Sequence, residues 1–154
     1  MKRILQLAIA LVLFGFVSLA GAAQQAQEYR FDPPHCNITF MVRHIFVNVP
    51  GRFVDFSGTV RFDPKNLEGS LFDVTVQAAS LDTFVDKRNE HLRSAEFFDV
   101  AKYPEIRFTS SRITHKAGNI YAVKGTLTLK GVSRAVELPV TYFGKKANPM
   151  NPQQ

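Results

Sequence analysis

Apolar and polar side chains alternate along several short segments of the chain. Between positions 36 and 62 most alternate side chains are apolar, and the pattern recurs at 72–78, 106–110 and 121–129. Because successive strand side chains point to opposite faces, this period of two predicts β-strands with one apolar face. Such strands must close around their own side chains or around an apolar ligand. The predicted inward positions are Ile38, Phe40, Val42, His44, Phe56, Gly58, Val60, Phe62, Phe72, Val74, Val76, Ala78, Ile106, Phe108, Ser110, Tyr121, Val123, Gly125, Leu127 and Leu129.

Turn signals divide the chain into short strands, as is typical of an all-β domain. The dipeptides Pro50-Gly51, Asp63-Pro64 and Glu68-Gly69 each predict a turn. The segments between the turn signals predict strands at 29–31, 36–48, 52–62 and 70–80, and a last strand is expected at 135–143.

One charged stretch, residues 82–93, lacks the alternation. Asp86 is the predicted N-cap of a short helix, with Leu92 facing inward. We therefore predict one helix over Asp86–Arg93, whose charged face lies in solvent with local ion pairs, followed by a turn at 94–97.

The first residues predict a secretory signal peptide. Lys2 and Arg3 precede an apolar run that ends in small residues, with cleavage expected after Ala22 or Ala23. An uncleaved membrane anchor is the alternative, but the run is shorter than the ~20 residues of a membrane span. We therefore assign residues 1–22 to the signal peptide and 23–154 to one exported domain, which is periplasmic if the source is a Gram-negative bacterium.

Charge and cysteine content limit the partners of this domain. The net charge of +6 falls to about +4 when Lys2 and Arg3 are removed, and after export nucleic acid is not an available partner. Weak contact with an anionic membrane surface is the expected consequence. Cys36 is the only cysteine, so no internal disulfide forms. Its parity predicts a buried thiol, and pairing between two chains, which would give a homodimer, is the alternative.

The sequence carries no motif for catalysis or metal binding. The four histidines, His35, His44, His91 and His115, form neither His-x-His nor His-x-x-x-His. No nucleophile elbow or glycine-rich phosphate loop is present. We therefore expect no catalytic residue, no cofactor and no metal. For His44 an interior side chain is the main interpretation, and a ligand contact is the alternative.

Phenylalanine dominates the aromatic residues. Twelve of the 14 Phe follow the signal peptide, and the chain has no Trp. Phenylalanine adds bulk without a hydrogen-bond donor, so it suits a dry cavity wall. The small residues at Gly58, Ala78, Ser110 and Gly125 are expected to leave room inside a barrel that holds a ligand. At ~0.8 kcal/mol per buried CH₂, two or three five-carbon units already provide roughly the −8 kcal/mol of micromolar binding.

Several sequence blocks follow one another in the order seen in one known family. They are Asp32-Pro33-Pro34-His35, Ile38-x-Phe40-x-Val42-x-His44, Gly51-Arg52-Phe53, Phe56-Ser57-Gly58, Ala79-Ser80-Leu81-Asp82-Thr83, Lys87-Arg88-x-Glu90-His91-Leu92, Phe97-Phe98-Asp99-Val100, Tyr103-Pro104-x-Ile106-x-Phe108 and Gly125-x-Leu127-Thr128-Leu129-Lys130-Gly131-Val132. Together they span Tyr29 to about Phe143 and resemble the YceI-like family of polyisoprenoid-binding, lipocalin-like barrels.

The resemblance implies an antiparallel lipocalin-like β-barrel with one short helical insertion. It also implies a non-enzymatic periplasmic protein that carries or sequesters a polyisoprenoid, an isoprenoid-quinone-like lipid or a similar long-chain amphiphile in an apolar channel. An enzyme acting on such a lipid would need polar groups converging on His44, and a structural or stress-related protein would have a solidly packed core. The expected ligand-binding residues are Ile38, Phe40, Val42, His44, Phe56, Val60, Phe62, Phe72, Val74, Val76, Ile106, Phe108, Tyr121, Val123, Leu127 and Leu129. For the head-group end, polarity alone suggests His35, His44 and Arg88.

Three features depart from the family pattern. Cys36 stands where the family usually has a small hydroxyl residue, and Asn89 stands where an acid usually follows Arg88. Family members also continue past the equivalent of residues 144–146 with strands that close the barrel. We therefore expect this chain to be C-terminally incomplete and its barrel to be unclosed, with an exposed strand edge.

Overall fold

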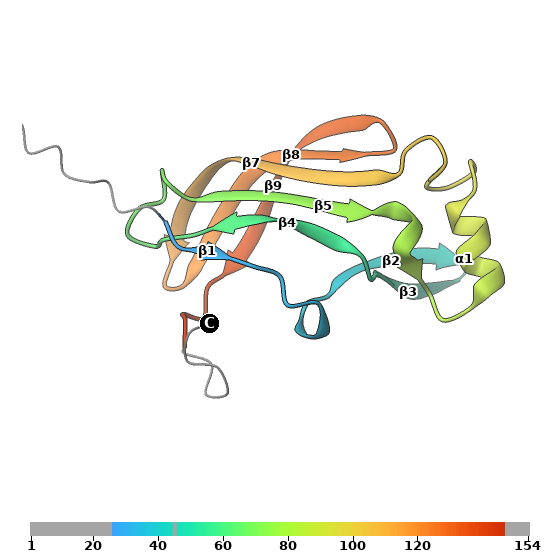
Figure 1. The fold of residues 1–154 in the computed structure, drawn as a ribbon, viewed down its shortest axis with the longest axis horizontal. Helices are drawn as coiled ribbons and strands as arrows, with labels where there is room; N and C mark the ends of the chain where they lie inside the picture. The colour runs from blue at the N-terminus through green and yellow to red at the C-terminus, as the bar shows by residue number, and fades with distance from the viewer. Residues whose placement is uncertain (1–25, 45, 147–154) are drawn as a thin grey trace, which may run out of the picture.

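The computed structural model describes residues 26–44 and 46–146, so the predicted signal peptide at residues 1–22 lies outside the described part. Two antiparallel sheets and one α-helix make up the fold (Figure 1). The strands are β1 (Glu28–Tyr29), β2 (Ile38–His44), β3 (Val47–Phe53), β4 (Phe56–Arg61), β5 (Leu71–Gln77), β6 (Leu81–Asp82), β7 (Glu105–Ala117), β8 (Ile120–Leu129) and β9 (Val132–Thr141). The helix is α1 (Asp86–Arg93), and two 3₁₀ turns are η1 (Pro33–His35) and η2 (Ala78–Ser80).

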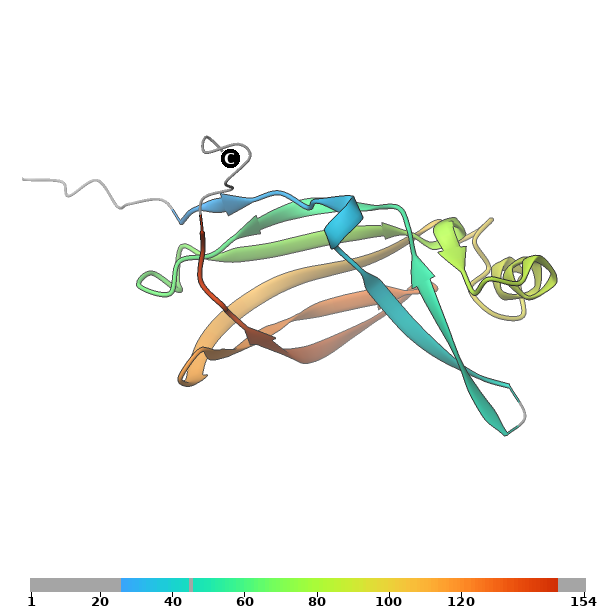
Figure 2. The ribbon, with the colours of Figure 1, turned by 90° about the horizontal axis from the view of Figure 1, so that it is seen from below.

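The larger sheet has the order β1-β4-β5-β7-β8-β9, and the smaller has the order β2-β3-β6. Figure 2 shows the larger sheet bending from β1 and β4 on one side to β8 and β9 on the other, with the β2–β3 hairpin and α1 at one end. Within the described residues β9 pairs only with β8, and β2 pairs only with β3. The predicted all-β antiparallel fold with one helix is confirmed, and its barrel is open.

The first hairpin differs from the prediction. The sequence indicated a strand over 36–48 and a turn at Pro50-Gly51, but β2 ends at His44 and Pro50 lies inside β3, opposite Met41. The smaller sheet tolerates this proline because β6 pairs with β3 only from Arg52 onward, so Pro50 lies where β3 has a neighbour on one side alone. The predicted strand over 52–62 is likewise two strands, since β3 ends at Phe53 and β4 begins at Phe56.

Helix α1 has the predicted bounds, but its start and its charged residues behave differently from the prediction. Val85 is the N-cap, and Asp86 is the first helical residue. Arg88 does not simply face solvent, because its guanidinium donates to the hydroxyl and carbonyl oxygens of Thr83 at 2.8 and 2.7 Å. The buried amide oxygen of Asn89 accepts hydrogen bonds from the backbone N–H and the hydroxyl of Thr83, at 2.8 and 2.7 Å. These bonds attach α1 to the loop that follows β6.

Two core clusters lie at the two ends of the larger sheet's concave side. One consists of Phe62, Phe108, Ile113, Tyr121 and Val123. The other consists of Phe53, Val76, Leu81 and Leu92, and it joins the sheets to the inward face of α1. Leu92 is buried, as predicted. Figure 1 shows α1 at one end of the molecule and the β4–β5 and β7–β8 turns at the other.

The last hairpin begins earlier than expected. Lys130 and Gly131 both have positive φ (48° and 72°) and connect β8 to β9 by a two-residue turn. Positive φ at both central positions is the geometry of a type I′ turn, which matches the twist of paired strands. β9 therefore starts at Val132. It lies at the edge of the larger sheet, next to β8.

Candidate functional site

An apolar cavity of about 260 Å³ lies between the larger sheet and β2, and we name it the slot. Strands β5, β7, β8 and β9 contribute alternate side chains to it, because residues two apart on a strand share a face. Among the described residues its ten lining side chains are all apolar: Ile38, Phe72, Val74, Val76, Ile106, Phe108, Val123, Leu127, Leu138 and Val140. A surface of this composition offers an occupant dispersion contacts and water exclusion but no hydrogen bond.

A second apolar cavity, of about 520 Å³, adjoins the slot at Ile106, and we name it the outer chamber. It opens to solvent, since Met41 and Phe97 on its wall are 63% and 40% exposed. Its described lining is Phe40, Met41, Val42, Phe53, Leu92, Glu96, Phe97, Phe98, Ile106, Leu129 and Lys130. The charged members belong to the segment after α1 and to the β8–β9 turn, where Lys130 donates to the carbonyl oxygen of Ala95 at 2.8 Å.

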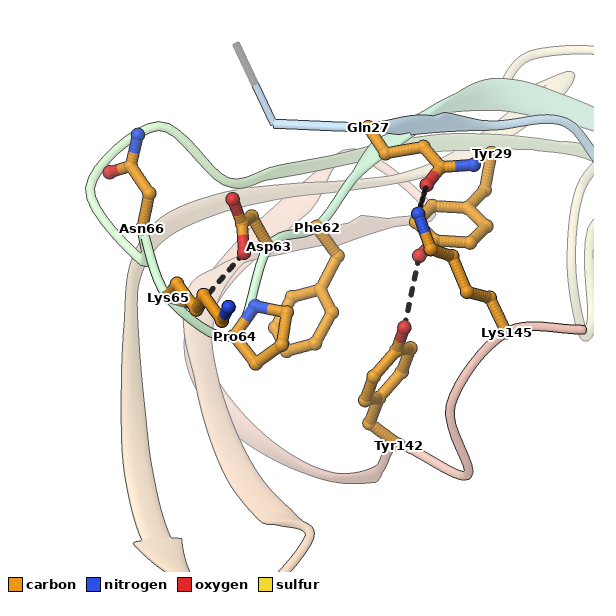
Figure 3. A pocket seen from close by; sticks show the side chains of 9 residues that line it. All are labelled: Gln27, Tyr29, Phe62, Asp63, Pro64, Lys65, Asn66, Tyr142 and Lys145. Carbon is orange, nitrogen blue, oxygen red and sulfur yellow. Dashed lines mark hydrogen bonds between the residues drawn. The ribbon is translucent and has the colours of Figure 1, made fainter. Parts of the chain in front are cut away.

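A polar pocket of about 530 Å³ lies at the opposite end of the molecule (Figure 3). The hydroxyl groups of Tyr29 and Tyr142 are 3.3 Å apart, and the ammonium group of Lys145 donates to the side-chain oxygen of Gln27 at 2.7 Å. Burial and the hydrogen bond to Tyr142 raise the pKa of Tyr29 to about 12. The pocket is lined by Gln27, Tyr29, Phe62, Asp63, Pro64, Lys65, Asn66, Tyr142 and Lys145.

Most of the predicted ligand-binding residues line these apolar cavities. Eight line the slot: Ile38, Phe72, Val74, Val76, Ile106, Phe108, Val123 and Leu127. Phe40, Val42 and Leu129 line the outer chamber. Phe56 packs against the core cluster next to α1, while Phe62 and Tyr121 belong to the other cluster. Val60 is half-buried and pairs with Tyr29 of β1. His44 ends β2, and its side chain lies outside the described part of the structure.

Sequence reasoning missed several lining residues. Leu138 and Val140 of β9 face the slot, and the period of two in the predicted strand over 135–143 could have identified them. Phe97 and Phe98 line the outer chamber from the irregular segment after α1, where no periodic pattern marks an inward face.

Three of the small inward residues, Gly58, Ser110 and Gly125, do not leave open space, contrary to expectation. A Cβ at Gly125 would lie 2.6 Å from the ring of Phe108, and still closer to the backbone oxygen of Thr109. At Gly58 the backbone of Asp73 and Val74 occupies that space. The Ser110 hydroxyl oxygen accepts the backbone N–H of Phe72 at 2.9 Å. These residues therefore allow close packing of rings and strands, and the slot lies elsewhere.

The polar residues considered for a head group lie outside the slot lining. His35 is exposed and hydrogen-bonds Asp32 at 2.8 Å, while Arg88 is engaged with Thr83. Cys36 is half-buried, less than its predicted burial. Within residues 26–44 and 46–146, no three His, Cys, Asp or Glu side chains are grouped so that they could hold a metal ion. The same residues include no helix of the length and apolarity needed to cross a membrane.

Comparison with known proteins identifies the family. The model of the YceI-like domain matches residues 29–151. The chain belongs to the YceI-like family. A UPF0312 protein of Pectobacterium atrosepticum is 38% identical over 144 residues, which cover 92% of this chain and 74% of that protein. Protein YceI of Salmonella newport is 37% identical over 151 residues, which cover 96% and 76%. The resemblance predicted from the sequence blocks is therefore confirmed.

Solved structures of this YceI-like fold agree with the architecture described above. The crystal structure of Burkholderia cenocepacia BcnA has a TM-score of 0.72 and 32% identity, over 75% of this chain and 73% of that chain. The Campylobacter jejuni YceI protein has a TM-score of 0.63 and 32% identity, over 81% and 74%. The lipocalin-like arrangement expected from the resemblance is thus shared with experimentally solved relatives.

Proposed function

We propose that this YceI-like protein binds one long-chain, isoprenoid-like amphiphile, with the apolar chain in the slot and the head group at the outer chamber. The observation that carries the proposal is the wholly apolar lining of the slot, to which four strands of the larger sheet and Ile38 of β2 contribute. Burial of apolar surface supplies affinity without directional contacts, so a flexible hydrocarbon chain is the class of ligand that such a lining favours.

The length of the apolar interior supports a long chain. Along β8 the stretch from Tyr121 to Leu129 rises by roughly 27 Å at ~3.4 Å per residue, and it runs from the ring of Phe62 to the outer chamber. The hydrocarbon core of a bilayer, which two opposed acyl chains fill, is about 30 Å thick. A wall of this length, shared by the slot and the outer chamber, favours a long chain such as a polyisoprenoid or quinone tail.

The internal void and its lining also bear on the alternatives. A solidly packed structural protein would have no slot, and an enzyme would need polar groups that converge on the bound chain. The charged side chains of the outer chamber, Glu96 and Lys130, belong to segments at its edge, which supports binding without chemistry. The apolar run before Ala22 supports export, so we infer a periplasmic carrier or sequestering role.

Native mass spectrometry of the protein isolated from its own cell envelope, without detergent, tests the proposal. We expect an adduct that organic solvent releases and that a purified polyprenol can replace. The Val74→Asp variant should lose the adduct, whereas Ser57→Asp, on an exposed position of β4, should retain it. A folded protein that carries no lipid and takes up no added polyprenol would refute the proposed function.

A further inference from the structure

We propose that the ring of Phe62 is a stop at the inner end of the slot and sets the longest chain that the slot accepts. This inference rests on the proposed function and adds to it a residue that determines which ligands fit. Phe62 follows directly on β4, where the strand leaves the larger sheet for the Asp63-Pro64 turn. It belongs to the core cluster on the side of the molecule away from α1.

The ring of Phe62 lies between the slot and the polar pocket. Its centroid is 6.1 Å from that of Phe72, which lines the slot, and 5.1 Å from that of Tyr142, which lines the polar pocket. Tyr121 closes the group at 4.9 Å. Phe62 itself lines the polar pocket and is only 4% exposed. Figure 3 shows its ring between the Asp63-Pro64 turn and Tyr142. A chain that advanced along the slot would therefore meet this ring.

Several contacts keep the ring in place. The rings of Tyr121 and Tyr142 meet Phe62 edge to face, an arrangement that aromatic pairs favour. The backbone N–H of Phe62 donates to the carbonyl oxygen of Gln27 at 3.0 Å, which attaches the end of β4 to the segment before β1. The backbone N–H of Tyr142 donates to the carbonyl oxygen of Asn119 at 2.9 Å. The stop is thus a fixed part of the packed core.

The chemistry changes across the ring. The slot is lined by hydrocarbon, whereas the pocket behind Phe62 presents Asp63, Lys65 and the Gln27–Lys145 pair. An apolar chain gains nothing by displacing water from these charged groups, but it gains from the site of the Phe62 ring itself, which the rings of Phe72, Tyr121 and Tyr142 surround. Without the Phe62 ring, however, the cavity of about 260 Å³ would connect with a space of about 530 Å³. The Phe62→Ala variant should then accept chains that are too long for the unmodified protein.

A series of polyprenols, each one isoprene unit longer than the last, tests this inference. The dissociation constant of each polyprenol is measured for the unmodified protein and for its variants. For the unmodified protein we expect affinity to rise with length up to a limit. In Phe62→Ala the limit should move by at least one unit, with the first polyprenol beyond the original limit bound on the order of tenfold tighter or more. Phe53→Ala, which removes an equally buried ring from the outer chamber, should weaken all lengths and leave the limit unchanged.

The outcomes separate the two proposals. If the unmodified protein binds polyprenols and the limit is the same in Phe62→Ala, the stop is refuted while the proposed function stands. If neither protein binds any polyprenol, the proposed function fails and the stop fails with it. Should Phe62→Ala not fold, Phe62→Leu keeps part of the core volume, and an unchanged limit in that variant refutes the stop equally.

Discussion

Replacing Val74 by aspartate is a direct test of the slot. Val74 lies in the middle of β5, opposite Gly58 of β4 and Phe108 of β7, and its side chain lines the slot. While the slot is empty, water can solvate the new carboxylate, so we expect the variant to fold. A bound hydrocarbon chain would exclude that water. The carboxyl group must then become protonated or lose its hydration without a partner.

Protonation sets an upper bound on the pH-dependent part of the loss of affinity, which adds to the cost of burying the neutral carboxyl group. With an ordinary aspartate pKa of ~3.9, protonating the group costs about 4 kcal/mol at pH 7 and about 1.5 kcal/mol at pH 5. This part should therefore raise the dissociation constant by up to roughly a thousandfold at pH 7 and roughly tenfold at pH 5. Because the bound ligand excludes water, the complex favours the neutral acid. Lowering the pH therefore restores binding.

The assay is a polyprenol titration of each variant at both pH values, with thermal unfolding to verify the fold. Val74→Asn has nearly the same shape and no charge, so its loss of affinity should be smaller and independent of pH. Ser57→Asp places the same charge on an exposed position of β4 and should bind normally. Equal affinities of Val74→Asp and the unmodified protein at pH 7, or equal losses at the two pH values, would refute the apolar slot as the binding site.

The packing and the buried hydrogen bonds can be tested at three other positions. Asn89→Ala should lower the free energy of unfolding by about 1–3 kcal/mol in urea titrations, since Thr83 loses its buried acceptor; an unchanged midpoint would contradict this. Gly125→Ala should cost about 1–3 kcal/mol, seen as a lower melting temperature, because the added methyl group meets the backbone oxygen of Thr109 and the Phe108 ring; unaltered melting would contradict this close packing. The pKa of Tyr29 is about 12 in the folded protein and ~10 in the unfolded chain, so the folded state holds the phenol proton more tightly. This contribution to stability is complete below pH 10 and is lost as the pH rises toward 12. Tyr29→Phe should abolish the last phenolate transition in an ultraviolet titration, and its persistence would assign that transition to another tyrosine.

Which side chains share a face follows from the order of residues along each strand. Val74 and Val76 on β5 and Ile106 and Phe108 on β7 all line the slot, because a strand's period of two applies wherever the strand lies in the fold. The bounds of α1 were also predictable, since the charged stretch interrupts the alternation where the helix forms. These properties depend on neighbours along the chain and on local backbone geometry.

Which strands are neighbours depends on the folding of the whole chain. Pro50-Gly51 has the composition of a turn, yet it lies within β3 because β6 leaves that part of the strand unpaired on one side. Phe62 and Phe72 look alike in the alternating pattern, but Phe72 lines the slot and Phe62 closes it. The ring of Phe62 packs against that of Tyr142, which is 80 positions farther along the chain. Periodicity gives the face of a side chain, whereas its function depends on contacts that form only when distant strands pair.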